Sequence, residues 1–247
     1  MTKRPTPQQA TLHIYQTKFP DSEGCILAGS VLRGKGTDSS DLDIVVIYRN
    51  VKAAYRESFQ SDGWPVEAFV HDLETLNYFF ENVEKPSGVP SLPSMVLEGV
   101  GIPGPSELLS RAKSLAQKAI TEGPLVWNGE QIDRARYGIT DLCDDMKTPR
   151  SSDELIGTAT RLYEALTDFH FRSRNKWSAK GKSIPRRWGQ ESPELAAQFN
   201  YAFDQLFRAG NPSFAINFCE QILAPYGGWL FDKFKLEAPA EWKLPAQ

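Results

Sequence analysis

The sequence has 247 residues, of which 40% are hydrophobic, 24% charged and 11% aromatic. These fractions are typical of globular proteins, and they exclude a fibrous or wholly disordered chain. The formal net charge is −3, from 28 Lys and Arg against 31 Asp and Glu. We therefore expect no nucleic-acid partner bound over the whole surface, although one local basic patch is present.

The cysteines and histidines limit the metal chemistry open to the chain. Cys25, Cys143 and Cys219 lie far apart and form no CxxC pair, which favours buried thiols in a reducing compartment. The 3 histidines cannot complete a zinc signature with them, so any metal ion would be bound by oxygen ligands. No apolar run is long enough to cross a membrane, and no secretory signal follows the N-terminus. We predict a cytoplasmic protein, monomeric or homodimeric, with no membrane partner.

The first half of the chain mixes predicted strands and helices. Residues 41–48 end in an unbroken apolar run, as in a central strand that is covered on both faces. An Asp-Gly pair at 62 and 63, between two strand-like runs, favours a hairpin turn. The predicted elements are a helix over 6–19, strands over 25–28, 41–48, 55–60 and 66–70, and a helix over 72–81.

The second half is predicted to be almost entirely helical. Residues 85–106 are too rich in Pro and Gly for a long helix or a central strand, so we place the domain boundary there; residues 94–100 could form a short apolar strand. Helices are predicted over 106–122, 129–146 and 151–174, and two more begin at 192 and 211. The predicted fold is α+β: an N-terminal domain over 1–95 with a small mixed β-sheet and helices, followed by a C-terminal α-helical bundle over 106–247.

Two acids stand at the start of the predicted central strand. Asp41 and Asp43 are two residues apart, so on a strand both side chains leave the same face, roughly 7 Å apart along the backbone. At that spacing they can share one hard cation, and carboxylates are ligands that Mg²⁺ prefers. Glu67 lies in an otherwise apolar predicted strand, where burial of an acid is costly unless it is paired or binds a metal. An ion pair with a nearby Lys or Arg is the alternative for Glu67.

A possible phosphate-binding turn precedes these acids. Gly29 and Ser30 end a predicted strand and offer backbone N–H groups and a hydroxyl, which suit a phosphate. Ser40 offers a further hydroxyl beside Asp41. A P-loop is excluded, because Gly36 stands where Ser or Thr should ligate Mg²⁺ and because a strand, not a helix, follows.

This arrangement resembles the signature of the polymerase-beta-like nucleotidyltransferase superfamily: Gly-Ser, ten residues, then Asp-hydrophobic-Asp-hydrophobic, with a third acid on a later strand. Within that superfamily the chain looks most like the aminoglycoside-type antibiotic nucleotidyltransferases, in which a helical bundle follows the catalytic domain. The resemblance implies that Asp41, Asp43 and Glu67 are catalytic and hold Mg²⁺, two ions being expected. It also implies that Gly29, Ser30 and Ser40 bind the phosphates of ATP.

The segment Gly181-Lys-Ser-Ile-Pro-Arg186 is similar to a second, weaker motif of the same helical domains. That similarity implies a basic side chain on the triphosphate, assigned first to Lys182 and then to Arg186. The helical domain would thus contribute to nucleotide and acceptor binding. The implied reaction transfers AMP from ATP to a hydroxyl of a small, aminoglycoside-like acceptor and releases pyrophosphate. Glu67 would either complete the second metal site or deprotonate the hydroxyl.

Other functions remain open at this point. The same chemistry could act on a tRNA end or a protein side chain, or the fold could serve as a non-catalytic antitoxin or nucleotide sensor. The basic run over 172–188 fits a solvated helix end or a triphosphate clamp, with RNA binding as a third interpretation. Asp141, Asp144 and Asp145 fit a solvated helix face or an acidic wall for a cationic acceptor.

Overall fold

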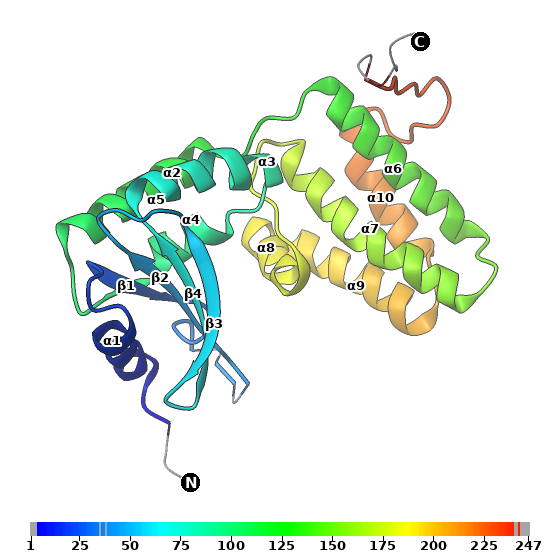
Figure 1. Cartoon of the computed structure of the whole chain (residues 1–247). Helices are drawn as coiled ribbons and strands as arrows, with labels where there is room; N and C mark the ends of the chain where they lie inside the picture. Colours follow the sequence, from blue (N-terminus) through cyan, green and yellow to red (C-terminus); the bar gives the residue numbers. More distant parts are fainter. Residues whose placement is uncertain (1–3, 35, 38, 240–241, 243–247) are drawn as a thin grey trace, which may run out of the picture. The chain divides into compact units, whose positions relative to one another are not determined.

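The computed structural model describes residues 4–34, 36–37, 39–239 and 242. Contacts within the chain divide it into two compact units, Met1–Leu125 and Val126–Gln247. The first unit contains a mixed β-sheet with helices, whereas the described part of the second is helical, so the predicted α+β fold is confirmed (Figure 1). The division falls after Leu125, later in the chain than the predicted boundary over 85–106.

The elements of the first unit include the four strands predicted between residues 25 and 70. In chain order they are α1 (Pro7–Lys18), β1 (Gly24–Ala28), β2 (Leu42–Ile47), β3 (Tyr55–Ser61), β4 (Trp64–His71), α2 (Leu73–Phe79), the π-helix η1 (Phe80–Glu84), α3 (Lys85–Ser87), α4 (Ser91–Glu98), β5 (Val100–Ile102) and α5 (Glu107–Glu122). Local capping explains two of the helix starts: the side chains of Thr6 and Asp72 accept hydrogen bonds from backbone N–H groups in the first turns of α1 and α2.

The five strands form one sheet in the order β3-β4-β2-β1-β5. β2 and β4 are parallel, and the other neighbouring pairs are antiparallel. The predicted hairpin is confirmed: Asp62 and Gly63 join β3 to β4 with φ of 51° and 78°, the two positive values that a type I′ turn requires. This turn fixes the register of β3 on β4.

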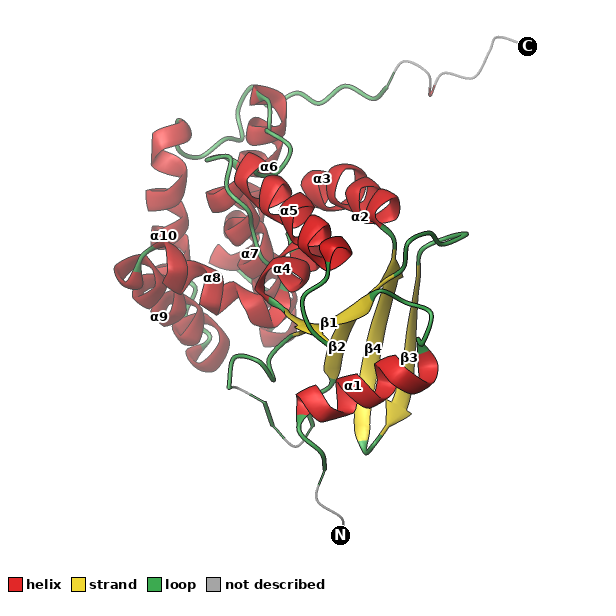
Figure 2. Ribbon diagram, turned by 90° about the vertical axis from the view of Figure 1, so that its left-hand side faces the viewer, coloured by secondary structure: helices red, strands yellow, loops and turns green. Residues whose placement is uncertain are grey.

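Each face of the sheet packs against its own helices (Figure 2). Alternate residues of β2, namely Leu42, Ile44 and Val46, join a core with Ala10 and Ile14 of α1. The residues between them point the other way, and there Val45 and Ile47 share a core with residues of α2, α4 and α5. β2 is therefore covered on both faces, as its apolar run predicted.

Two predictions for the linking region are corrected by the structure. Residues 94–100 do not form a strand: 94–98 belong to helix α4, and β5 begins only at Val100. Pro93 fits α4 because it lies in the first turn, where a missing N–H breaks no intrahelical bond. Helix α5 was assigned to the bundle, but Leu109, Ala112 and Ala116 lie in the core that covers the sheet. An amphipathic pattern shows that a helix has a buried face, not which core receives it.

The second unit has one core, to which every long helix of its described part contributes. Its elements are α6 (Gly129–Lys147), α7 (Ser152–Arg172), the 3-10 helix η2 (Gly181–Ser183), α8 (Ile184–Glu191), α9 (Pro193–Ala209), α10 (Ser213–Leu223) and the 3-10 helix η3 (Ala224–Tyr226). α8 was not predicted, because its basic residues dominate the sequence there; its buried side is formed by Ile184 and Trp188, four residues apart. Across the described residues, no helix combines the length and the apolar character needed to span a bilayer.

Candidate active site

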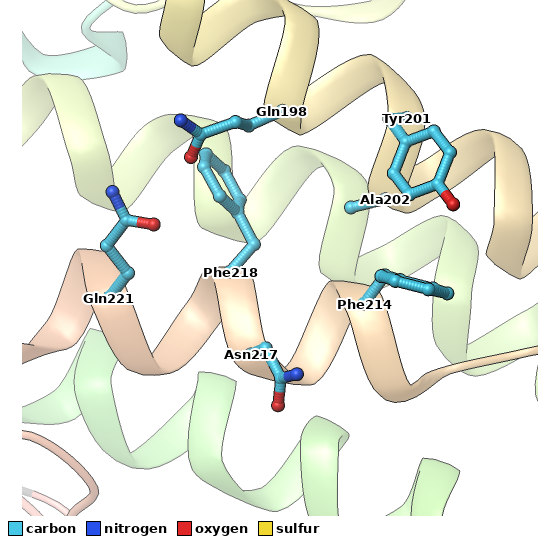
Figure 3. Close-up of a pocket in the computed structure, with 7 residues that line it drawn as sticks. All are labelled: Gln198, Tyr201, Ala202, Phe214, Asn217, Phe218 and Gln221. Carbon is cyan, nitrogen blue, oxygen red and sulfur yellow. The ribbon is translucent and has the colours of Figure 1, made fainter.

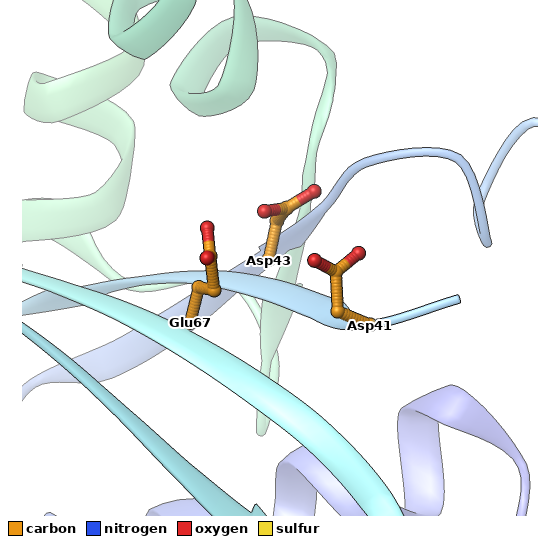
Figure 4. Close-up of side chains that lie close together, drawn as sticks. All are labelled: Asp41, Asp43 and Glu67. Atoms are coloured by element: carbon orange, nitrogen blue, oxygen red, sulfur yellow. The ribbon is translucent and has the colours of Figure 1, made fainter. Parts of the chain in front are cut away.

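Strand pairing brings the three sequence-predicted acids of the first unit together. Asp41 directly precedes β2, and Asp43 is its second residue. In the parallel pairing of β2 with β4, Asp43 lies opposite Glu67. Paired residues project from the same face of a sheet, and so do residues two apart on one strand. The three carboxylates accordingly point to one side of the sheet (Figure 4).

The acid cluster, as we call Asp41, Asp43 and Glu67, is compact. One carboxylate oxygen from each residue can be chosen so that all three lie within 4.8 Å of one another. All three residues are half-buried, so water only partly screens their mutual repulsion. Such a set of hard oxygen donors suits a divalent cation such as Mg²⁺, which would offset that repulsion. The chemistry of the donors therefore fits the metal that the sequence predicted.

Gly29 lies directly against the acid cluster. It follows Ala28, which pairs with Asp43 in the antiparallel β1–β2 ladder. Its φ is +85°, a conformation that glycine adopts readily, and a Cβ at this position would overlap Oδ2 of Asp43. The close approach of backbone to carboxylate thus depends on the missing side chain. Ser30 is the next residue, at the start of the loop that leads to Asp41. Its side chain is half-buried.

Ser40 lies at the other end of the same loop and is held in a local turn. Its Oγ accepts a hydrogen bond of 2.8 Å from the backbone N–H of Thr37, and its own N–H donates to the carbonyl of Thr37 at 3.0 Å. The turn places Ser40 immediately before Asp41. The predicted phosphate-binding groups Gly29, Ser30 and Ser40 therefore lie at the two ends of the loop that precedes Asp41 in the chain.

Arg56 is a residue of this site that the sequence analysis did not identify. Its Nη2 lies 2.6 Å from Oε1 of Glu67, although the arginine side chain is 56% exposed. The guanidinium also lies over the ring of Phe69, 5.0 Å from the centroid. The ion pair considered as the alternative for Glu67 is thus present, together with the acid cluster rather than in place of it. The register fixed by the Asp62-Gly63 turn would have revealed this neighbour.

The predicted triphosphate-binding residues of the helical half lie in the second unit. Lys182 belongs to η2, Arg186 lies in the first turn of α8, and both are exposed. The turn that carries Lys182 is anchored to α7, because the N–H of Gly181 donates to Oε1 of Glu164 at 3.3 Å. Lys182 and Arg186 are four residues apart, which is compatible with both contacting one anion.

The basic run over 172–188 has a countercharge at its end that the sequence analysis did not consider. Glu191 lies within 2.7 Å of Lys176, 2.9 Å of Arg174 and 3.8 Å of Arg187. Burial opposes ionisation of Glu191, but the hydrogen bond from Lys176 and the neighbouring positive charges hold its pKa below the ordinary value. Part of the basic run therefore forms an ion-pair network within the second unit, and Lys182 and Arg186 are separate from the contacts of Glu191.

The α6 acids, Asp141, Asp144 and Asp145, are all exposed on that helix. Asp144 forms an ion pair of 2.6 Å with Lys147.

Elsewhere in the second unit, a cavity of about 200 Å³ lies between α9 and α10 (Figure 3). Aromatic rings and neutral amides line it, including Tyr201, Phe214 and Gln198. No charged side chain lines this cavity, so it offers no counterion to a phosphate.

Comparison with family models agrees with the geometry of the first unit. Residues 11–87, which include the acid cluster and Gly29, match the family model described as a nucleotidyltransferase domain. Among solved structures, the chain is similar to a nucleotidyltransferase-like protein from Exiguobacterium sibiricum, with 14% identity, a TM-score of 0.43, and coverage of 88% of this chain and 74% of that chain. The comparison with curated proteins gives no match. Residues 11–87 of the first unit are therefore similar to a nucleotidyltransferase domain, the family that the sequence resembles.

Proposed function

We propose that this protein transfers AMP from ATP to a hydroxyl of a small, aminoglycoside-like acceptor and releases pyrophosphate, in a reaction that depends on Mg²⁺. The observation that carries the proposal is the convergence of the acid cluster beside Gly29, inside the segment that matches the nucleotidyltransferase domain. In this reaction a bond forms between the acceptor oxygen and the α-phosphorus. The bond from the α-phosphorus to the bridging oxygen breaks, and pyrophosphate leaves.

Each candidate site residue of the first unit has a proposed task in that displacement. Asp41 and Asp43 hold divalent cations, and Glu67 either shares this task or accepts the proton of the attacking hydroxyl. Bound Mg²⁺ would neutralise the negative charge that builds up on the phosphates. The backbone N–H groups at Gly29 and Ser30 and the hydroxyl of Ser40 bind phosphate oxygens. No nucleophilic side chain is required, because positioning and charge neutralisation supply the catalysis.

In the second unit, Lys182 is the proposed cation for the triphosphate, with Arg186 as a second contact. Both side chains are exposed, and Glu164 anchors the turn before Lys182, so the lysine sits on a fixed backbone. The α6 acids are the proposed attraction for a cationic acceptor. Their exposure is compatible with this role, since an aminosugar would bring ammonium groups from solvent.

A pyrophosphate-release screen tests the proposal. The full-length protein is incubated with each of the four nucleoside triphosphates and with aminoglycosides, lincosamides or tRNA, in Mg²⁺ and in excess EDTA. We expect release with ATP and an aminoglycoside only when Mg²⁺ is present. Release with tRNA alone would contradict the acceptor class, whereas equal ATP affinity with and without Mg²⁺ in calorimetry would contradict the metal dependence.

A further inference from the structure

Arg56 is placed beside the acid cluster by the register of the β3–β4 hairpin. In that antiparallel pairing Arg56 lies opposite Phe69. Residues that lie opposite each other share a face of the sheet, and Phe69 shares its face with Glu67, two residues earlier. The arginine side chain therefore starts on the same face as the acid cluster and reaches Glu67 along the diagonal, a common cross-strand contact.

Two contacts hold the guanidinium there. It forms the 2.6 Å ion pair with Oε1 of Glu67 and lies over the ring of Phe69. At the same time, a carboxylate oxygen of Glu67 remains within 4.8 Å of oxygens of Asp41 and Asp43. The ion pair thus does not pull Glu67 out of the cluster, and the guanidinium adds one positive charge next to three negative ones.

That charge must affect how the acid cluster binds a cation. A guanidinium in contact with Glu67 repels a divalent cation at the cluster and shares the carboxylate with it. A second effect acts in the opposite direction, because an arginine that fixes the Glu67 side chain reduces the entropy lost on metal binding. Fixing one glutamate rotamer is the smaller of the two contributions, since a full positive charge lies within a few ångströms of a half-buried site.

We propose that Arg56 lowers the affinity of the acid cluster for free divalent cations, so that they enter the site together with the triphosphate. This inference rests on the proposed function. The triphosphate brings several negative charges, which outweigh the single charge of Arg56. A site tuned in this way does not fill with metal before the nucleotide arrives, and Arg56 then governs the order in which metal and nucleotide bind.

The experiment measures binding of Mn²⁺ alone to the full-length protein without nucleotide, from the signal of free Mn²⁺ in electron paramagnetic resonance at about 0.1 M salt. Arg56→Met removes the charge and keeps an apolar side chain for Phe69; we expect it to bind Mn²⁺ about three- to tenfold tighter than the wild type, the exposure of Arg56 limiting the gain. Arg56→Gln is a second neutral variant in case methionine perturbs the strand. Arg56→Lys keeps the charge and should stay within about twofold of the wild type.

Arg49→Met is the matched control. Arg49 pairs with Glu23 and lies two residues beyond the end of β2. The strand from Asp43 to Ile47 alone spans roughly 13 Å, which is more than the screening length of about 10 Å at this salt. It should leave Mn²⁺ affinity unchanged. Tighter binding in Arg56→Met must also vanish when Asp41→Asn and Asp43→Asn are added, which locates it at the cluster.

Neutral variants that bind Mn²⁺ no tighter than the wild type would overturn the inference and leave the proposed function intact. Tighter binding that persists without the two aspartates would also overturn it. If neither the wild type nor any variant bound more Mn²⁺ than a nucleoside triphosphate binds in a control without protein, the proposed function itself would fail.

Discussion

Two groups of three acids in the described part of the chain, the acid cluster and the α6 acids, behave differently. The acid cluster is half-buried on a β-sheet, and its carboxylate oxygens come within 4.8 Å of one another. The α6 acids stand at i, i+3 and i+4 on a helix, so they too share one side of their element. Yet they are exposed, and Asp144 is neutralised by Lys147. The acid cluster is thus a compact set of possible metal ligands, whereas the α6 acids form a solvated helix surface.

The difference shows what makes acids a candidate site. A carboxylate on an exposed helix can rotate into water, where repulsion is weak and salt screens it. On the sheet, the backbone fixes the acid cluster in register, and Gly29 and Arg56 occupy the space around it. The repulsion is then retained in the folded chain and can be relieved by a bound cation. Convergence forced by the backbone, rather than the number of acids, points to function.

The strongest test of this comparison removes two charges from each group. Asp41→Asn with Asp43→Asn should abolish Mg²⁺-dependent ATP binding in calorimetry and lower pyrophosphate release by about 10³-fold or more, because the remaining ligand cannot hold the metal. Asp144→Asn with Asp145→Asn removes the same charge from α6 and should leave ATP binding unchanged. Similar losses in both double variants would show that net charge, not coordination, drives binding.

The next test concerns the space beside the acid cluster. Gly29→Ala introduces a Cβ that overlaps Oδ2 of Asp43 at a positive φ, so we expect pyrophosphate release to fall by about 10²-fold and the free energy of unfolding by about 1–3 kcal/mol. Gly63→Ala is the matched control: its φ is +78°, but its neighbours are atoms of Arg4 at 3.5 Å and beyond. Gly63→Ala should lower the free energy of unfolding in urea denaturation without lowering pyrophosphate release. If Gly29→Ala kept its activity, the close approach of Gly29 to Asp43 would not be needed for the reaction.

The acid cluster could be predicted because strand chemistry is local. Alternation along 41–48 places Asp41 and Asp43 on one face, and the Asp62-Gly63 turn predicts the hairpin that carries Glu67. Parallel pairing of β2 with β4 was the step that the sequence could only suggest. Arg56 was missed although the same hairpin determines its position, since the register was not followed to the neighbouring strand.

Other features depend on contacts that no local pattern contains. The apolar face of α5 would fit either core, and only the packing of Leu109 and Ala112 shows that it covers the sheet. The Pro and Gly residues over 85–106 argued against a long helix, but the first turn of the short helix α4 tolerates Pro93. There, Oε1 of buried Glu84 accepts a 3.0 Å hydrogen bond from the N–H of Leu92. This contact joins η1 to α4, so the pattern of either segment alone does not contain it.

Glu84 is a third kind of acid, buried singly, and it gives a test by pH. Burial raises its pKa from 4.5 to about 7, against the hydrogen bonds from Leu92 and Ser91. Below pH 4.5 the folded and unfolded chains both hold the proton. Between pH 4.5 and 7 the unfolded chain loses it first, so the contribution of Glu84 to the free energy of unfolding falls as pH rises.

Glu84→Gln removes this titration and keeps an acceptor for Leu92. Relative to the wild type, its free energy of unfolding should therefore rise by about 2–3 kcal/mol between pH 4.5 and 7.5, measured by urea denaturation at a series of pH values. Glu130→Gln, at an exposed position in the first turn of α6, is the control and should show no such trend. Parallel pH profiles for wild type and Glu84→Gln would mean that the folded chain holds Glu84 ionised like a surface acid.

The smallest expected effect belongs to the α6 acids, whose proposed role is long-range attraction of a cationic acceptor. Replacing all three by Asn should raise KM for an aminoglycoside about two- to fivefold at low salt, because exposed charges act weakly and through solvent. The increase should disappear near 0.5 M salt, while kcat and ATP affinity remain unchanged. A salt-independent rise in KM would instead indicate direct contact, and an unchanged KM at low salt would leave these acids as a solvated helix face.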